Sequence, residues 1–502
     1  MEPETDLAQL RSILNEYTDL VHIIGLLHWD QETYMPPGGA AERGHQLSAL
    51  TRIAHLKFTS DDVGRLLEDL KSYANSLDPD SDDARLIKVT NRLYRKRSKV
   101  PASLMAEIAK AASDGHLVWV KSREDGDFVK FQPFLETNID LRRQYAECFR
   151  PYDHIYDPLL DFYEPGLKTE DVQTIFSNLR PQQVELIRAI SERSQVDDSF
   201  LHQHYDESKQ WDFGVEVITQ YGFDWQSGRQ DRSTHPFTQG VGLGDVRITT
   251  RFMQDYFPSA FFSTTHECGH GLYAQGVDPK LRRTPLANGA SLAIHESQSR
   301  MFENVVGRSR DFWTHFYPRL QEYFPTQLGD VSPDAFYKAI NKVEPSWIRV
   351  EADEPTYNLH IMLRLELEIA MIEGSLEAKD LPEAWNNGMQ EFLGTTPPND
   401  SMGVLQDVHW SQGSIGYFST YALGNLVAAQ LWEVVCSDIS DLPEQIRRGE
   451  FEALTAWMRE NIHRHGAKFE PQELVQRVTG SKIDPDPYMR YLTNKYTEIY
   501  EI

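Results

Sequence analysis

The sequence has few cysteines and no long apolar run. Its 502 residues include three cysteines, Cys148, Cys268 and Cys436, which are too few and too widely spaced for a disulfide framework. No run of about 18 apolar residues is present, and the acidic start MEPETDLAQL lacks an apolar core of signal-peptide length. These absences predict a cytoplasmic protein without a membrane partner.

Positive charge is scarce as well. The chain has 50 lysines and arginines against 76 aspartates and glutamates, which gives a formal net charge of −26. A field of this sign repels phosphate groups, so the composition argues against nucleic acids and anionic membranes as partners. Most of these charges are expected on solvated helix faces.

No segment divides the chain into separate domains. Linkers rich in proline, glycine or serine are missing, as are repeats and low-complexity runs. Hydrophobic residues make up 40% of the chain and aromatic residues 11%, which is enough for a large core. We therefore expect residues 1–502 to form one large helical body with two lobes, although the length alone suggests about three domains.

Helical patterns fill most of the sequence. Residues 101–116 begin with a proline and are expected to form a helix that stops near Gly115. Capping residues and apolar positions at helical spacing predict further helices over 80–99, 332–343, 355–374 and 450–466.

A small β element is predicted between residues 235 and 252. This segment is punctuated by glycines, and its stretch DVRITT places Val246 and Ile248 on one face and polar residues on the other. In peptidases such an edge can hold an extended peptide by main-chain hydrogen bonds. A hairpin that only closes the fold explains the pattern equally well. The predicted fold class is mostly α, with this β element beside the helix described next.

The stretch STTHECGHGLYAQG, residues 263–276, has the spacing of a metal-binding helix. Residues four apart lie on one face of an α-helix, so His266 and His270 can both offer a nitrogen to one cation. Glu267 lies about 100° further round, where it can act on a water molecule without being a ligand. Cys268 faces elsewhere and is interpreted as a small buried thiol.

The sequence also predicts where this helix begins and ends. Pro258 and Ser259 supply a start, and Gly276 is expected to end the helix by adopting a left-handed conformation. Gly269 costs roughly 1 kcal/mol inside a helix relative to alanine. A small residue between the two histidines would, however, allow close packing or substrate approach.

A third ligand is expected on the next helix. Glu296 lies 26 residues after His270, which leaves room for a helix end, a loop and an antiparallel helix. Two histidines and one glutamate leave a fourth position open, as in catalytic rather than structural sites. His295 is the rival ligand but points away from Glu296. Chance occurrence of the motif is the alternative to a catalytic metal site.

Two further segments are dense in polar and aromatic residues. One contains Arg349, followed by Glu351 and Asp353 just before a helix. The other, residues 403–425, has the glycine punctuation of a rigid loop that leads into a helix. A lone histidine or tyrosine is more often a core residue than a catalyst, but the clustering favours function here. The second segment contains Gln406, Asp407, His409, Trp410, Tyr417 and Tyr421.

Together these motifs resemble the Taq-type metallocarboxypeptidases, the thermostable carboxypeptidase family. The resemblance spans nearly the whole chain in the right order, and it includes the opening HWDQETYMPPGGAAERG. No motif position departs from the family pattern. The motifs are His235-Pro236-Phe237, Asp245-x-Arg247-x-Thr249, His266-Glu267-x-x-His270, His295-Glu296-Ser297-Gln298, Ile348-Arg349-x-x-Ala352-Asp353 and Gly403-x-x-Gln406-Asp407-x-His409-Trp410.

The resemblance implies a fold, an assembly and an activity. The expected molecule is a mostly α-helical homodimer in which each subunit has a deep active-site cleft. It would remove single residues from the C-termini of peptides with broad specificity. The expected cofactor is one divalent metal ion per subunit, most often zinc and sometimes cobalt, bound by His266, His270 and Glu296.

Roles for the other residues follow from the chemistry and from the resemblance. Glu267 is the expected general base. Charge that develops on the carbonyl oxygen needs a donor, for which Tyr421, by similarity to related helical zinc dipeptidases, and then His409 are candidates. Arginine is the best side chain to bind the terminal carboxylate. Arg349 is the candidate that the resemblance favours.

The remaining candidates concern substrate binding. Arg247 and Arg300 are alternative carboxylate ligands, although Arg300 lies one helical turn after Glu296 and is expected to pair with it. Arg349 has its own alternative, a structural ion pair with Glu351 or Asp353. His235 is also expected to contact substrate.

Two other functions stay open at this point. One is a zinc oligopeptidase that cuts peptides internally, because the same kind of site serves both reactions. The other is a metal-binding interaction protein without turnover. The presence of Glu267 argues against the second, because metal ligation alone does not require that residue.

Overall fold

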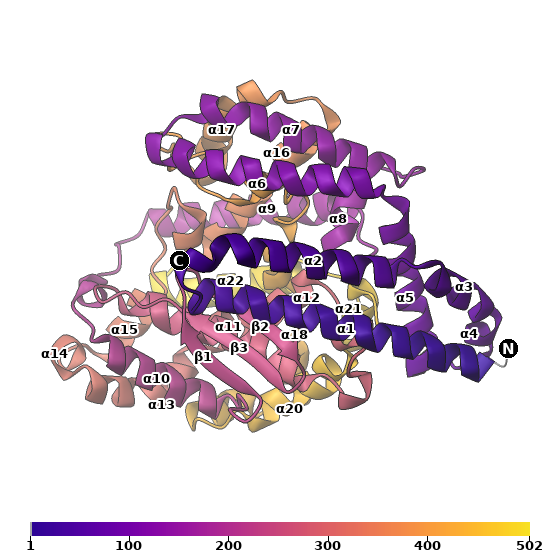
Figure 1. Ribbon diagram of the computed structural model, residues 1–502. Helices are drawn as coiled ribbons and strands as arrows, with labels where there is room; N and C mark the ends of the chain where they lie inside the picture. The colour runs from indigo at the N-terminus through magenta and orange to yellow at the C-terminus, as the bar shows by residue number, and fades with distance from the viewer. Residues whose placement is uncertain (1–2) are drawn as a thin grey trace.

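A computed structural model describes residues 3–502, and helices dominate it (Figure 1). The mostly α-helical fold predicted from the sequence is confirmed. Within these residues, none of the helices has both the length and the apolar character needed to cross a lipid bilayer. The α-helices are α1 Pro3–Thr33, α2 Ala40–Phe58, α3 Asp61–Asp69, α4 Lys71–Ser76, α5 Asp82–Lys99, α6 Ala102–Asp125, α7 Phe128–Glu147, α8 Asp157–Tyr163, α9 Thr169–Ser191, α10 Glu207–Gln220, α11 Phe257–Gly276, α12 Leu292–Arg300, α13 Arg310–Tyr323, α14 Pro325–Leu328, α15 Pro333–Ile340, α16 Glu354–Glu373, α17 Leu381–Leu393, α18 Ser419–Asp438, α19 Leu442–Arg447, α20 Glu452–Asn461, α21 Pro471–Thr479 and α22 Asp486–Tyr500.

One small sheet interrupts the helices directly before α11. Its strands β1 (Gly228–Arg232), β2 (Thr238–Gly242) and β3 (Asp245–Thr250) have the order β1-β3-β2, with β1 parallel and β2 antiparallel to β3. Val246 and Ile248 are fully buried, as their alternation predicted. The sheet packs against α11, so the predicted β element beside the histidine helix is confirmed.

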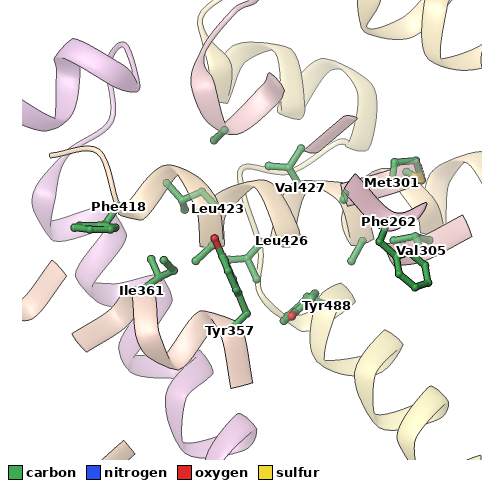
Figure 2. Packing of buried hydrophobic residues seen from close by; sticks show 14 of the residues in the cluster. Phe262, Met301, Val305, Tyr357, Ile361, Phe418, Leu423, Leu426, Val427 and Tyr488 are labelled. Atoms are coloured by element: carbon green, nitrogen blue, oxygen red, sulfur yellow. The ribbon is translucent and has the colours of Figure 1, made fainter. Parts of the chain in front are cut away.

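A single large cluster of buried apolar residues includes members of helices along the chain from α6 to α22. Helix α18 lies inside it, where it contacts α12, α16 and α22. Figure 2 shows this packing, with Leu423 and Leu426 of α18 on the side of Tyr357 and Ile361 of α16. A second, smaller cluster joins α1, α3 and α5 to residues 277–286. The interior around α11, α12 and α18 is therefore the framework that holds the polar groups described below.

The helix predicted to stop near Gly115 does not stop there. Helix α6 continues to Asp125 and ends at Gly126, whose φ of 65° closes the helix in the left-handed conformation. Gly115 is buried inside α6, and a Cβ atom on it would lie 2.6 Å from the carbonyl oxygen of Ser411. The glycine is needed for close packing against the segment that follows His409, not for a helix end.

Candidate metal centre and active site

Helix α11 presents both histidines of the metal motif on one face. It begins at Phe257 with Pro258 in its first turn, close to the predicted start. The rings of His266 and His270 lie 4.9 Å apart between centroids. Gly276 is the last residue of α11, but it has no positive φ. A Cβ atom there would lie 2.5 Å from the Cβ of His463, so this glycine serves packing rather than the predicted left-handed helix end.

Two glycines bring a second helix close to the histidines. A Cβ atom on Gly269 of α11 would lie 2.4 Å from the carbonyl oxygen of Gln298 in α12. A Cβ atom on Gly424 of α18 would lie 2.5 Å from the Cγ of Glu296. Since neither position has a side chain, α12 packs directly between α11 and α18. This contact places Glu296 opposite the two histidines and explains why a glycine is kept inside α11.

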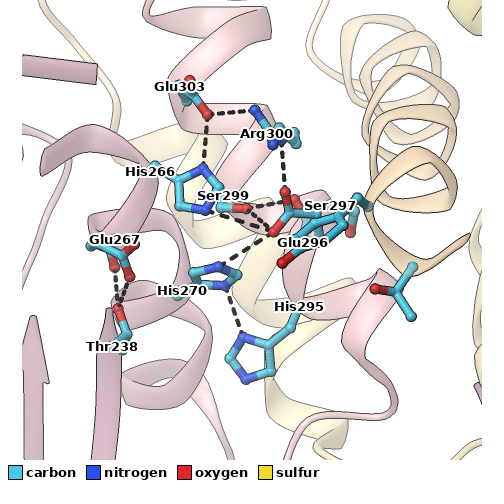
Figure 3. Close-up of polar contacts among 12 residues, drawn as sticks. Thr238, His266, Glu267, His270, His295, Glu296, Ser297, Ser299, Arg300 and Glu303 are labelled. Carbon is cyan, nitrogen blue, oxygen red and sulfur yellow. Dashed lines mark hydrogen bonds and ion pairs between the residues drawn. The ribbon is translucent and has the colours of Figure 1, made fainter. Parts of the chain in front are cut away.

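The three predicted ligand atoms form a compact donor set (Figure 3). Oε2 of Glu296 lies 3.6 Å from Nε2 of His266 and 3.6 Å from Nε2 of His270. One atom from each residue can be chosen so that all three lie within 4.8 Å of one another. Ligand atoms bound to one tetrahedral zinc ion lie about 3.3–3.6 Å apart. The three residues therefore fit a divalent cation.

Each candidate ligand has a partner on its far side. Nδ1 of His266 lies 2.8 Å from Oε2 of Glu303, and Nδ1 of His270 lies 3.1 Å from Nδ1 of His295. Arg300 donates from Nε to Oε1 of Glu296 at 2.7 Å. Such partners fix the tautomer and orientation of metal-binding side chains. His295 thus contacts the side of His270 that faces away from the donor set. The expected pairing of Arg300 with Glu296 is observed.

The donor set lies in a strongly negative environment. Burial opposes charge on His266, but the carboxylates of Glu296 and Glu303 outweigh it and raise the pKa of His266 to about 9. Burial opposes the ionised form of Glu303, but Arg300 and His266 lower its pKa to about 2. Burial and His270 lower the pKa of His295 to about 3, so that ring is neutral. Clustered carboxylates that favour a positive charge on His266 also suit a cation at this place.

Glu303 is a residue that the sequence analysis missed. It lies on a π-helical turn, Met301–Val306, which continues α12 directly. Single π-helical turns often occur at functional sites because they redirect side chains. The spacing of seven residues between Glu296 and Glu303 was an available signal, since it places both on one side of a regular helix.

The expected base, Glu267, is buried and has a specific hydrogen-bond donor. Its side chain is 6% exposed, and its Oε2 accepts a hydrogen bond of 2.7 Å from Oγ1 of Thr238. Thr238 belongs to β2, so the small sheet contacts the reactive residue directly (Figure 3). The sequence analysis included Thr238 in the predicted β element but gave it no role.

A second polar cluster surrounds Arg349, where α16 begins. Nε of Arg349 donates to Oδ1 of Asp407 at 2.9 Å, and Nε of Arg364 donates to Oδ2 at 2.6 Å. The ion pair of Arg349 with Glu351 or Asp353, the alternative to its role in substrate binding, is not present in the described part of the chain, and Asp407 is the partner instead. Asp353 instead caps α16 by accepting from the backbone of Thr356. Two guanidinium groups share one carboxylate, which leaves a buried net positive charge.

Tyr357 connects the two clusters. Its hydroxyl accepts a hydrogen bond of 2.9 Å from Nη1 of Arg349, and the Cζ of Arg300 lies 4.7 Å from its ring centroid. The donor set around Glu296 and the arginine cluster are thus separated by one aromatic side chain. The sequence analysis placed Tyr357 in the helix predicted over 355–374 but gave it no role.

His409 and Tyr421 meet beside the arginine cluster. Nε2 of His409 lies 3.2 Å from the Tyr421 hydroxyl, and the Cζ of Arg349 lies 5.0 Å from the Tyr421 ring centroid. Burial and Arg349 lower the pKa of His409 to about 3. Burial raises the pKa of Tyr421 well above its usual value. A neutral imidazole and a protonated phenol can both act as hydrogen-bond donors.

The other two predicted substrate ligands lie apart from this cluster. Arg247, on β3, holds both oxygens of Asp245 at 2.8 and 2.7 Å, and its Cζ lies 4.2 Å from the Trp29 ring centroid. His235 is exposed in the loop between β1 and β2, where its carbonyl oxygen accepts from Ser233. The structure therefore groups Arg349 with His409 and Tyr421, but not Arg247 or His235.

Comparison with known proteins agrees with this geometry. A family model described as carboxypeptidase Taq (M32) metallopeptidase matches residues 9–496. The chain belongs to this family. Thermostable carboxypeptidase 1 of Thermus thermophilus is 40% identical over 510 residues, and the match covers 100% of both chains. Carboxypeptidase 1 of Bacillus subtilis is 35% identical over 501 residues, again covering 100% of both.

A solved structure shows the same fold. The M32 carboxypeptidase from Deinococcus radiodurans R1 is 38% identical, with a TM-score of 0.96, and the match covers 99% of this chain and 100% of that one. Membership of the M32 family confirms the prediction of a metallocarboxypeptidase, a hydrolase that acts on peptides, and implies a divalent metal ion. It favours neither the internally cutting oligopeptidase nor the interaction protein without turnover.

Proposed function

We propose that this metallocarboxypeptidase is zinc-dependent and releases single amino acids from free peptide C-termini with broad side-chain specificity. The main observation behind this proposal is the contrast in charge between two adjacent clusters of side chains. A donor set of two histidines and a glutamate lies beside Glu267 in a negative environment. One aromatic ring away lies a buried cluster with net positive charge. The first suits a cation and hydrolysis, and the second suits a terminal carboxylate.

In the proposed reaction Glu267 transfers a proton from water to the leaving group. His266, His270 and Glu296 would hold a divalent ion, and the Lewis-acid chemistry of that ion would polarise the scissile carbonyl group and make water more acidic. Glu267 accepts a proton from the attacking water and delivers it to the leaving nitrogen. Burial of this carboxylate keeps bulk water from competing for the proton.

Tyr421 and His409 stabilise the charge that develops on the substrate oxygen. The phenol of Tyr421 retains its proton because its pKa is raised by burial, so it can donate to an oxyanion. His409 holds the phenol through its Nε2 and is the second candidate donor. Arg349 lies against the Tyr421 ring and favours negative charge at this side of the site.

Arg349 is the preferred ligand for the terminal carboxylate. All three nitrogens of Arg364 donate within the cluster, and the fork of Arg247 is occupied by Asp245. Arg349 uses Nε for Asp407 and Nη1 for Tyr357, while its Nη2 has no hydrogen-bond partner within residues 3–502. An unused donor on a buried, net positive cluster suits a carboxylate.

Several finer properties accompany this proposal. The two-histidine, one-glutamate donor set suits zinc, and cobalt is an acceptable replacement. We also propose that residues 1–502 act as one catalytic unit and that two copies form a homodimer, as the family resemblance implies. The cytoplasmic location stays a prediction from the sequence.

Product analysis tests this function directly. The purified, metal-loaded protein is incubated with one peptide in two forms, with a free and with an amidated C-terminus, and products are identified by mass spectrometry. We expect successive loss of single C-terminal residues from the free form and no cleavage of the amidated form. Internal cleavage of both forms would instead establish an oligopeptidase. Chelation should abolish activity, and adding zinc should restore it.

A further inference from the structure

Thr238 is the only residue of the small sheet whose side chain bonds the carboxylate of Glu267, among residues 3–502. Its Oγ1 lies 2.7 Å from Oε2 of Glu267 and 3.1 Å from the backbone oxygen of the same residue (Figure 3). A hydroxyl group near both ends of one glutamate restricts the rotation of that side chain. Fixing a glutamate side chain in one rotamer has an entropic cost, which the hydrogen bond from Thr238 helps to offset.

The strand that carries Thr238 is well anchored. Next to it, Phe237 donates its N–H to Oγ1 of Thr249 at 2.9 Å and accepts from the N–H of Thr249 at 3.0 Å. Thr238 itself pairs with Ile248 of β3. Threonine is branched at Cβ and therefore stiff about χ1. The hydroxyl is thus a donor fixed by the sheet, independently of helix α11.

The covering helix α1 packs on the same strand. A Cβ atom on Gly25 of α1 would lie 2.6 Å from Nε2 of Gln239, which follows Thr238. Strand β2 therefore contacts α1 through Gln239 and α11 through Thr238.

We propose that Thr238 is a positioning residue for catalysis, which holds Oε2 of Glu267 so that Oε1 receives the proton of the attacking water. This inference rests on the proposed role of Glu267 as general base. The hydroxyl proton occupies one of the two lone pairs of Oε2 and makes this oxygen less basic than Oε1, which is therefore the preferred proton acceptor. The same Oε1 then releases the proton to the leaving nitrogen, and Glu267 returns to its ionised form. Within residues 3–502, the Thr238 side chain forms no hydrogen bond with the donor set itself.

Substitutions that remove or keep the hydroxyl test the proposal. Thr238→Val has nearly the same shape without the donor, Thr238→Ala is a smaller hydroxyl-free variant, and Thr238→Ser keeps the donor. We expect both hydroxyl-free variants to lower kcat by about 10–10²-fold, as loss of an orienting contact does, with KM changed less than about 2-fold. Thr238→Ser should retain kcat within about 3-fold.

A double-variant cycle separates positioning from general damage. In the Glu267→Gln background the base is absent, so adding Thr238→Val should cause no further loss of kcat. Zinc affinity, measured by competition with a chromophoric chelator, should stay within about 3-fold of the wild type. Thr250→Val is the matched control, because this buried sheet hydroxyl bonds Gln230 and Thr264 rather than Glu267. It should retain kcat.

The outcomes that overturn the proposal are distinct from failure of the proposed function. Wild-type kcat in the hydroxyl-free variants would overturn it, as would equal losses in Thr238→Val and Thr238→Ser. An additive loss in the Glu267→Gln background, or a parallel loss of zinc affinity, would show that Thr238 acts by supporting the fold. If the wild-type protein released no C-terminal residues, the proposed function itself would be wrong.

Discussion

The two halves of the site have opposite charge and are built differently. Around the histidines, the carboxylates of Glu267, Glu296 and Glu303 outnumber the two guanidinium groups that pair with them, those of Arg300 and Arg308. Around Arg349, two guanidinium groups share the carboxylate of one aspartate. The negative half comes from two helices that are close in sequence. The positive half joins Arg349 to Asp407, which lies 58 positions further along the chain.

This difference assigns a separate task to each half. A negative pocket of fixed donors attracts a cation and brings the chemistry to one place. A buried positive cluster attracts a carboxylate that would otherwise lose its hydration at considerable cost. Variants of the two halves should therefore change different kinetic constants.

Removal of the base should have the largest effect. Glu267→Gln keeps the shape of the side chain and can still accept the hydrogen bond from Thr238, but it cannot accept a proton. We expect kcat to fall by at least about 10²-fold. Zinc content, measured by elemental analysis, should remain near one ion per chain. Loss of the metal would instead mean that Glu267 is a ligand.

Removal of Arg349 should come next and should act on substrate recognition. We expect Arg349→Ala to lower kcat/KM for free-ended peptides by about 10–10²-fold, which reflects a lost charge-assisted contact. Its melting temperature should also fall, because Asp407 loses one of its two buried partners. Arg247→Ala is the comparison variant, and a larger effect there would transfer the role to Arg247.

Removal of the partner behind His266 should affect the metal rather than the substrate. Glu303→Gln weakens the acceptor that orients His266, so we expect zinc affinity to fall by about 10–10²-fold. With saturating zinc, KM for a free-ended peptide should change little. A changed preference for free over amidated peptides in this variant would break the division between the halves.

The sequence predicted the negative half better than the positive half, for a physical reason. Helical spacing alone placed His266 and His270 on one face, and Gly269 between them signalled a close helix contact. The sequence offered only the neighbours Glu351 and Asp353 as alternative partners of Arg349, but the structure pairs it with Asp407, far along the chain. Such contacts depend on tertiary packing, which local patterns do not encode.

Glycines show the same limit at the level of the fold. Gly115 and Gly276 were both predicted to lie at helix ends; α11 does end at Gly276, whereas α6 continues past Gly115. In the structure neither has a positive φ, and each makes room for a neighbour, the Ser411 carbonyl group in one case and His463 in the other. The sequence shows where a residue without a side chain is present, but only the packing shows why it is required there.

Binding to the inactive variant tests the division of tasks most directly. Zinc-loaded Glu267→Gln is titrated by calorimetry with one peptide carrying a free or an amidated C-terminus. Because a charge-assisted contact with Arg349 is available only to the free form, we expect it to bind at least about tenfold more tightly. Adding Arg349→Ala should remove this difference. Equal affinity for both peptides before that substitution would contradict a carboxylate site in the positive half.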